Sequence, residues 1–309
     1  MALPTDRLVR RLPRLPFPYS APTTPGGVEP LPRRPTSGAD YDTAWARRPL
    51  ARVVRAAIVE AVARPAVAAL ARPDRRGLDR LDPLAARGGP VIFAANHHSH
   101  LDTPLLITSI PEPWRHRLFV GAAADYFFRT RATSALSALA LGAVPIERTK
   151  VARRSADRAA ALIAEGWSML IFPEGGRSPD GWGQPFRGGA AYLALRCGVP
   201  VVPVHLDGTG RILGKGQKVP RPASTRVTFG SPLVPEEGTD TRRFAARIEQ
   251  AVAELADEAT TDWWSARRRA HAGRTPPLAG PDAPAWRRAW ALGDPDRRRR
   301  RERRRWPPL

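Results

Sequence analysis

Short apolar runs alternate with amphipathic stretches over the middle of the chain, from about residue 46 to residue 260. The runs have the length of buried strands and lie at 90–95, 117–123, 142–147, 168–172, 199–206 and 226–230. Helical spacing of apolar positions marks most of the segments between them, at 102–110, 125–141, 151–166, 187–197 and 241–258. Strands separated by helices predict a single α/β domain, in which helices flank a largely parallel mixed sheet.

The two ends of the chain differ from this middle part in composition. Residues 1–45 are rich in proline, which cannot propagate a helix or a sheet, so we expect a disordered lead-in there. Residues 261–309 are rich in arginine and include a run, Arg297 to Arg305, with eight arginines. Like charges crowded in this way repel one another and oppose a packed core. The sequence therefore predicts one folded domain, 46–260, between two mostly disordered ends.

The formal net charge is +21, and such an excess bears on binding partners rather than on the fold. It suits nucleic acid, an anionic membrane surface or an acidic substrate. No run of about 20 apolar residues is present, and residues 1–16 lack the apolar core of a signal peptide. The single cysteine, Cys197, cannot form an internal disulfide. We therefore expect a structural thiol in a protein of the reducing cytosol that spans no bilayer.

Polar residues follow directly after the apolar run 90–95. Ligands of a parallel sheet bind outside the carboxyl ends of its strands, which is where these residues are expected to lie. Three of the four positions 97–100 are histidine, and Asp102 follows. On a continuous helix His97 and Asp102 would diverge by about 140°, but a strand that turns into a helix can bring them together. A carboxylate on one imidazole nitrogen raises the basicity of the other, so the pair is a candidate general base. Ser99 and Asp102 also have the spacing of a capping box, which would explain both without catalysis.

These residues match the HxxxxD signature, in its NHxSxLD form, of the glycerolipid acyltransferase family, whose prototype is 1-acylglycerol-3-phosphate acyltransferase. Further blocks follow in the family's order. Residues 142–148 resemble its block of glycine, apolar strand and arginine, and residues 172–178 are similar to its FPEGTRS block, with Gly176 in place of threonine. Residues 199–204 resemble its apolar strand with proline. The resemblance covers roughly residues 85–232.

The resemblance implies an O-acyltransferase of phospholipid biosynthesis. His97, oriented by Asp102, would take the proton of a lysophospholipid hydroxyl, which attacks the thioester of acyl-CoA or acyl carrier protein directly. The expected acceptor is 1-acyl-sn-glycerol-3-phosphate and the product is phosphatidic acid, with no metal or redox cofactor. Guanidinium groups grip phosphate with paired hydrogen bonds, and glycines let the backbone approach it. The expected phosphate-binding residues are Arg148, Glu174, Gly175, Gly176 and Arg177.

Other interpretations stay open on the sequence alone. His97, His98, His100, Asp102 and His205 could bind a metal ion, although adjacent histidines rarely point at one ion. The basic ends could bind nucleic acid, but they lack the interleaved aromatic residues of a single-strand binder, and no specific nucleic acid is expected. A non-catalytic membrane adaptor and an acyltransferase for another lysolipid or a glycolipid are further alternatives.

Residues 50–71 predict a helix kinked at Pro65 that could lie on a membrane surface. Its apolar ridge consists of Val54, Ile58 and Val62. Its arginine ridge consists of Arg48, Arg52 and Arg55. The run Arg297 to Arg305 would add electrostatic attraction to anionic lipid. The sequence thus predicts a peripheral protein on the inner face of the cell membrane.

Overall fold

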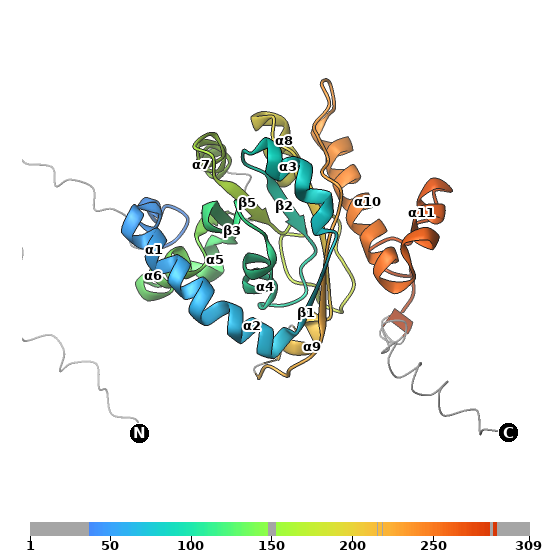
Figure 1. The fold of residues 1–309 in the computed structure, drawn as a ribbon, viewed down its shortest axis with the longest axis horizontal. Helices are drawn as coiled ribbons and strands as arrows, with labels where there is room; N and C mark the ends of the chain where they lie inside the picture. The colour runs from blue at the N-terminus through green and yellow to red at the C-terminus, as the bar shows by residue number, and fades with distance from the viewer. Residues whose placement is uncertain (1–36, 148–152, 215, 218, 285–286, 289–309) are drawn as a thin grey trace, which may run out of the picture. The chain divides into compact units, whose positions relative to one another are not determined.

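The computed structural model describes residues 37–147, 153–214, 216–217, 219–284 and 287–288. Within them a seven-stranded sheet has the order β1-β7-β6-β2-β5-β3-β4 (Figure 1). The strands are β1 Pro73–Arg76, β2 Ile92–Ala95, β3 Leu118–Ala123, β4 Ala143–Ile146, β5 Ser168–Ile171, β6 Val201–Asp207 and β7 Thr225–Phe229. All neighbouring strands are parallel except β6 and β7, which are antiparallel. The predicted largely parallel mixed sheet is confirmed.

Helices cover both faces of the sheet, because side chains alternate between two apolar cores along each strand. On β2, Phe93 and Ala95 belong to one core and Ile92 and Ala94 to the other. The first core also contains side chains of α2 Arg64–Ala71, α3 Asp82–Arg87, α4 Asp102–Ser109 and α9 Thr209–Leu213. The second contains those of α7 Arg153–Ala164, α8 Gly189–Cys197 and α10 Thr241–Thr260. The helices α1 Pro49–Ala57, α5 Ala124–Phe127 and α6 Arg131–Ala140 lie beside the β3–β4 edge (Figure 1).

The helix predicted over residues 50–71 consists of three helical segments. A π-helical stretch, Ile58–Ala63, joins α1 to α2 directly before Pro65. Proline has no N–H to donate, so the regular hydrogen-bond pattern cannot continue through it, and a π-turn accommodates the change. The predicted arginine ridge is wrong for one member: Arg55 is buried, whereas Val54 is exposed.

Two further differences come from polar segments. β1 is formed by Pro73, Asp74, Arg75 and Arg76, an edge strand whose polar sequence gives no apolar signal. The helix predicted over 125–141 is two helices, α5 and α6. Thr130 caps the second by accepting a hydrogen bond from the backbone N–H of Thr133. Such a cap starts a new helix within an otherwise continuous helical pattern.

The ordered chain extends past residue 260, the predicted end of the domain. Helix α11, Trp263–His271, packs on α10, and Arg269 forms a two-pronged ion pair with the buried Asp257 at 2.6 and 2.7 Å. This ion pair ties part of the arginine-rich segment to the domain, and Asp262 caps the helix by accepting from the N–H of Ser265. Residues 1–36 and the run Arg297 to Arg305 lie outside the described residues. No described helix is both long and apolar enough to span a membrane.

Candidate active site

His97 and Asp102 meet where β2 turns into α4, as the sequence predicts. The Nδ1 atom of His97 lies 2.8 Å from Oδ2 of Asp102, whose side chain is fully buried. The same oxygen accepts hydrogen bonds from the backbone N–H groups of His98 and Ser99, both at 2.7 Å. A carboxylate held in this way fixes the imidazole tautomer with its proton on Nδ1. The Nε2 atom of His97 is then the nitrogen able to accept a proton.

Two further contacts fix the turn that carries His97. Its ring stacks on Phe172, with ring centroids 4.1 Å apart. The side chain of Asn96 donates to the carbonyl of Leu206 on β6 and accepts from its N–H, at 2.9 and 2.7 Å. The end of β2 is thereby tied to the neighbouring strand, and the imidazole is held between a carboxylate and an aromatic ring.

Only one of the two hydrogen bonds of the predicted capping box is present: Asp102 accepts from the N–H of Ser99, but the Ser99 hydroxyl does not accept from the N–H of Asp102. Leu101 occupies the N-cap position of α4, and no side chain forms a capping hydrogen bond at that helix end. The Ser99 hydroxyl accepts from the N–H of Leu101 and donates to the carbonyl of Leu213, at the end of α9. Ser99 therefore joins the His97 turn to α9, and Asp102 serves the imidazole and the turn rather than a cap.

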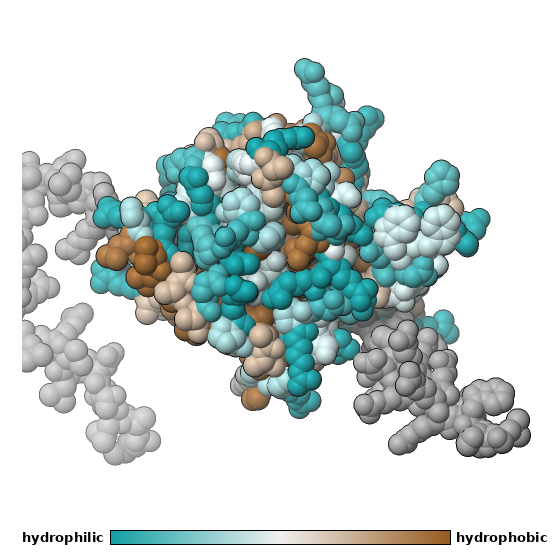
Figure 2. Space-filling view, viewed as in Figure 1, coloured by the Kyte–Doolittle hydropathy of each residue, from teal (hydrophilic) through white to brown (hydrophobic). Residues whose placement is uncertain are grey.

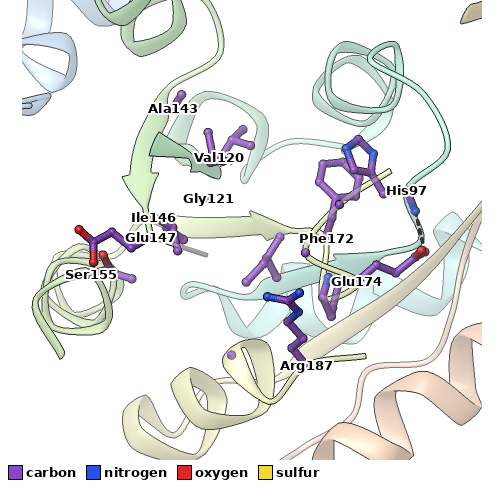
Figure 3. Close-up of a pocket in the computed structure, with 18 of the residues that line it drawn as sticks. His97, Val120, Gly121, Ala143, Ile146, Glu147, Ser155, Phe172, Glu174 and Arg187 are labelled. Carbon is purple, nitrogen blue, oxygen red and sulfur yellow. Dashed lines mark hydrogen bonds between the residues drawn. The ribbon is translucent and has the colours of Figure 1, made fainter. Parts of the chain in front are cut away.

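Glu174 lines the cavity and also supports the His97 backbone. It is 2% exposed, and its two oxygens accept hydrogen bonds from the backbone N–H groups of His97 and Gln184, at 2.9 and 3.0 Å (Figure 3). Burial raises the pKa of Glu174 to about 7, although both hydrogen bonds oppose that rise. The structure therefore shows a role for Glu174 that the sequence did not predict: it holds His97 in place.

Among the described residues, two arginines, Arg177 and Arg187, lie at the expected phosphate site. The charge of Arg177 acts on His100, whose pKa is lowered first by burial and then by this arginine. Arg187, which sequence reasoning missed, points into the cavity from the segment before α8 (Figure 3). Gly175 has φ +73°, and a Cβ there would lie 2.9 Å from Nε of Arg187, so the glycine leaves room for this arginine. Arg148 lies outside the described residues.

A signal for Arg187 was present in the sequence. It stands directly before Gly188 and Gly189, at the start of the helix that ends at Cys197. A cation beside two small residues at a helix start can approach a ligand closely. That pattern is common, however, and only the fold shows that it faces the FPEG segment.

These residues lie around a cavity of about 800 Å³ (Figure 3). One part of its wall carries His97, Gly175, Gly176, Arg177 and Arg187. Another part is apolar and consists of Val120, Ala122, Phe127, Leu141, Ala143, Ile146, Ala159 and Leu193. A ligand with an anionic head and an apolar chain matches both parts of this wall.

The histidines considered as metal ligands do not form a ligand set. No group of three or more His, Cys, Asp or Glu side chains in the described parts of the chain could hold a metal ion. Burial lowers the pKa values of His98 and His205, which favours their neutral forms. His100 instead pairs with Tyr126, whose hydroxyl lies 3.0 Å from its Nε2.

Comparisons with known proteins found a family model and several curated relatives that resemble this chain. Residues 75–207 match the model of a family described as Acyltransferase. The chain is 32% identical over 157 residues to the 1-acyl-sn-glycerol-3-phosphate acyltransferase BAT2 of Brassica napus, covering 50% of this chain and 43% of that protein. It is 34% identical to a 1-acyl-sn-glycerol-3-phosphate acyltransferase of Chlamydomonas reinhardtii, covering 53% and 48%. The chain thus spans somewhat less than half the length of these curated relatives.

A solved structure shares the fold. It is the 1-acyl-sn-glycerophosphate acyltransferase PlsC from Thermotoga maritima, with a TM-score of 0.55 and 21% identity. The similarity covers 72% of this chain and 84% of that one. At this level of identity it supports the fold: the sheet and its flanking helices.

Proposed function

We propose that this protein transfers a fatty acyl group from a thioester to the free hydroxyl of a lysophospholipid, because residues 75–207 match the acyltransferase family model. The proposed acceptor is 1-acyl-sn-glycerol-3-phosphate, the product is phosphatidic acid, and the donor is acyl-CoA or acyl carrier protein. The observation that carries this proposal is the His97–Asp102 pair, which opens onto a cavity with both a cationic and an apolar wall.

The reaction needs one proton carrier. Nε2 of His97 takes the hydroxyl proton while the hydroxyl oxygen attacks the thioester carbonyl, and Asp102 stabilises the imidazolium that forms. When the tetrahedral intermediate collapses, the C–S bond breaks and the thiolate receives the proton from His97. The proposed steps pass through no acyl-enzyme and require no metal or redox cofactor.

The cationic wall suits the acceptor's phosphate. Arg177 and Arg187 both follow Glu174 in the chain and line the cavity with it, and each can donate paired hydrogen bonds to phosphate oxygens. Arg148 remains part of the proposed site on the resemblance of its block alone. The apolar wall, which runs from β3 and β4 to α7 and α8, suits an acyl chain.

We also propose that the protein works on a membrane surface, at the inner face of the cell membrane, because its proposed acceptor is a lipid. Figure 2 shows an apolar patch over α1 and α6. Its exposed side chains are Leu50, Val53, Val54 and Leu136. Exposed apolar residues beside arginines are typical of helices that lie in a membrane interface. The exposed pair Trp263 and Trp264 on α11 is a second apolar feature of this kind.

The test is an assay of purified protein with oleoyl-CoA, comparing lysophosphatidic acid with monoacylglycerol, which lacks the phosphate. We expect phosphatidic acid as product and a much lower kcat/KM with monoacylglycerol. His97→Ala should lower turnover by about 10²-fold or more, whereas His116→Ala, a histidine outside the cavity, should not. Equal use of the two acceptors would contradict the phosphate site. An active His97→Ala protein would contradict the base.

Replacing Arg187 tests the cationic wall separately. Arg187→Gln removes the charge and the paired donors, so KM for lysophosphatidic acid should rise about tenfold or more. Its kcat/KM for monoacylglycerol should stay near that of the native protein. A variant that loses both acceptors equally would show that Arg187 supports the fold rather than the phosphate.

A further inference from the structure

A cluster of arginines lies on the face of α1 that packs against the domain. Arg55 is 6% exposed, and neither of its terminal nitrogens, Nη1 and Nη2, has a hydrogen-bond partner within the described structure. Arg52 is half-buried, and its Nε is likewise without a partner. Both guanidinium groups lie over the ring of Trp167, each 5.5 Å from its centroid. Two cations thus share one aromatic ring, and three of their buried nitrogen atoms have no partner among the described residues.

Among the described residues, no carboxylate compensates the charge of Arg55. Its pKa is lowered to about 10, first by burial and then by the charges of Arg52 and Arg47. Arg47 differs, because Glu165 and Asp42 act on it and its guanidinium donates to Thr43. A buried charge normally has an ion-pair or hydrogen-bond partner, because its desolvation is otherwise uncompensated. The natural partner for Arg55 is therefore an anion that is not part of the described chain.

The backbone makes room for this guanidinium. Gly142, just before β4, has φ +63°, and a Cβ there would lie 2.5 Å from Nη1 of Arg55. Trp167 precedes β5. The cluster is therefore at the amino-terminal edge of the parallel strands, whereas His97 follows the carboxyl end of β2. It is separate from the proposed active site.

We propose that Arg52 and Arg55, supported by Trp167, form a second anion site that binds a phosphate group. The unused N–H groups of Arg55 match the oxygens of a phosphate, and Arg52 and Arg47, which are half-buried rather than buried, are the members of the cluster that solvent reaches. Both a lipid headgroup and a soluble phosphate offer this chemistry.

The surroundings of the cluster favour the headgroup. Leu50, Val53 and Val54 are exposed on the opposite side of the same helix, where they form part of the apolar patch in Figure 2. An interfacial helix sinks its apolar face about 5–10 Å below the headgroups, and a helix is about 10 Å across. Arginines on the other side of α1 would then lie at the level of lipid phosphates. The site would orient the protein on anionic membranes independently of the chemistry of its active site.

Two measurements on the full chain test this site. Arg55→Gln removes the buried charge, and Arg52→Gln is the second variant in case the first folds poorly. Arg48→Gln is the matched control, since Arg48 is exposed on the same helix and loses the same charge. The first measurement is thermal unfolding in inorganic phosphate against sodium chloride of equal ionic strength. The second is co-sedimentation with phosphatidylcholine vesicles, with and without phosphatidylglycerol.

Phosphate should raise the Tm of the native protein and of Arg48→Gln by at least about 2 °C more than that of the cluster variants. Any phosphate in the active site acts equally on all of them. Binding to anionic vesicles should fall more than about tenfold in the cluster variants, against about fivefold or less in Arg48→Gln. A phosphate effect with unchanged vesicle binding would support the site with a soluble ligand. Equal behaviour of all variants in both measurements would overturn it.

Discussion

Replacing Asp102 with asparagine separates the charge of this residue from its hydrogen bonds. In the native protein Oδ2 accepts from Nδ1 of His97 and from two backbone N–H groups, while Oδ1 is buried without a partner among the described residues. An asparagine can place its oxygen at the Oδ2 position and keep all three acceptor contacts. Its NH₂ group then takes the Oδ1 position. The turn and the tautomer of His97 should therefore survive the change, and only the negative charge is lost.

The magnitude follows from the lost charge. In the proposed transition state His97 becomes an imidazolium whose charge lies roughly 4 Å from that of the Asp102 carboxylate, an interaction worth about 4 kcal/mol at an effective dielectric constant near 20. Removing it should lower kcat by about 10²–10³-fold. KM should hardly change, because Asp102 is fully buried. The unpaired NH₂ group should cost about 1–3 kcal/mol of folding stability.

The assay is steady-state acyl transfer from oleoyl-CoA to lysophosphatidic acid, with circular dichroism and thermal unfolding as checks of the fold. Asp79→Asn, an exposed residue with the same loss of charge, is the control and should keep native activity. Because Asp102 acts through His97, the change should have little further effect in a His97→Ala background. A folded Asp102→Asn protein within tenfold of native kcat would refute the reasoning, and so would additive losses in the double variant.

Two further predictions follow from the cavity and from Glu174. A Cβ at Gly121 would lie 2.7 Å from Ile146 and 2.9 Å from Met169. Gly121→Val should therefore narrow the apolar part of the cavity and shift the preference from oleoyl to decanoyl donors by about tenfold in kcat/KM. An unchanged ratio of the two kcat/KM values would refute this. Burial raises the pKa of Glu174 from its ordinary value near 4.5 to about 7. Its contribution to folding stability is therefore fully present below about pH 4.5 and is lost as the pH rises through about 7. The free energy of unfolding should fall by on the order of 3 kcal/mol over this range. Urea unfolding at pH 5 and pH 8 should show this slope in the native protein and less of it in Glu174→Gln; equal slopes would contradict it.

The sequence predicts the central part of the fold because apolar runs report burial on both faces of a parallel sheet. β2, β3, β4, β5, β6 and β7 all lie within or beside the predicted runs. β1 was missed for the same reason, since an edge strand of one proline and three charged residues has little apolar surface to bury. Periodicity also cannot show that a polar cap divides one helical pattern in two, as at Thr130.

The candidate site could be predicted only where residues close in sequence also meet in space. His97 and Asp102 are five residues apart, and their meeting was foreseen from the turn between them. The roles of Glu174 and Arg187 depend instead on contacts across the fold. A glutamate in a Pro-Glu-Gly turn looks like a ligand, and nothing local shows that both its oxygens are used by distant backbone groups.

The pairing of β2 with β5 explains how one site arises from motifs 77 residues apart. The two strands are parallel neighbours, with Ala94 opposite Ile171, so the segments that follow them leave the sheet side by side. Glu174 can then accept from the N–H of His97, and the N–H of Ser178 can donate to the carbonyl of His97, at 2.9 and 2.8 Å. These two bonds fix the position of the proposed base relative to the arginine-bearing segment. A change that breaks these two hydrogen bonds should therefore disturb both the proposed base and the proposed phosphate site, whereas a side-chain change such as Asp102→Asn, which leaves both bonds in place, should affect only one of them.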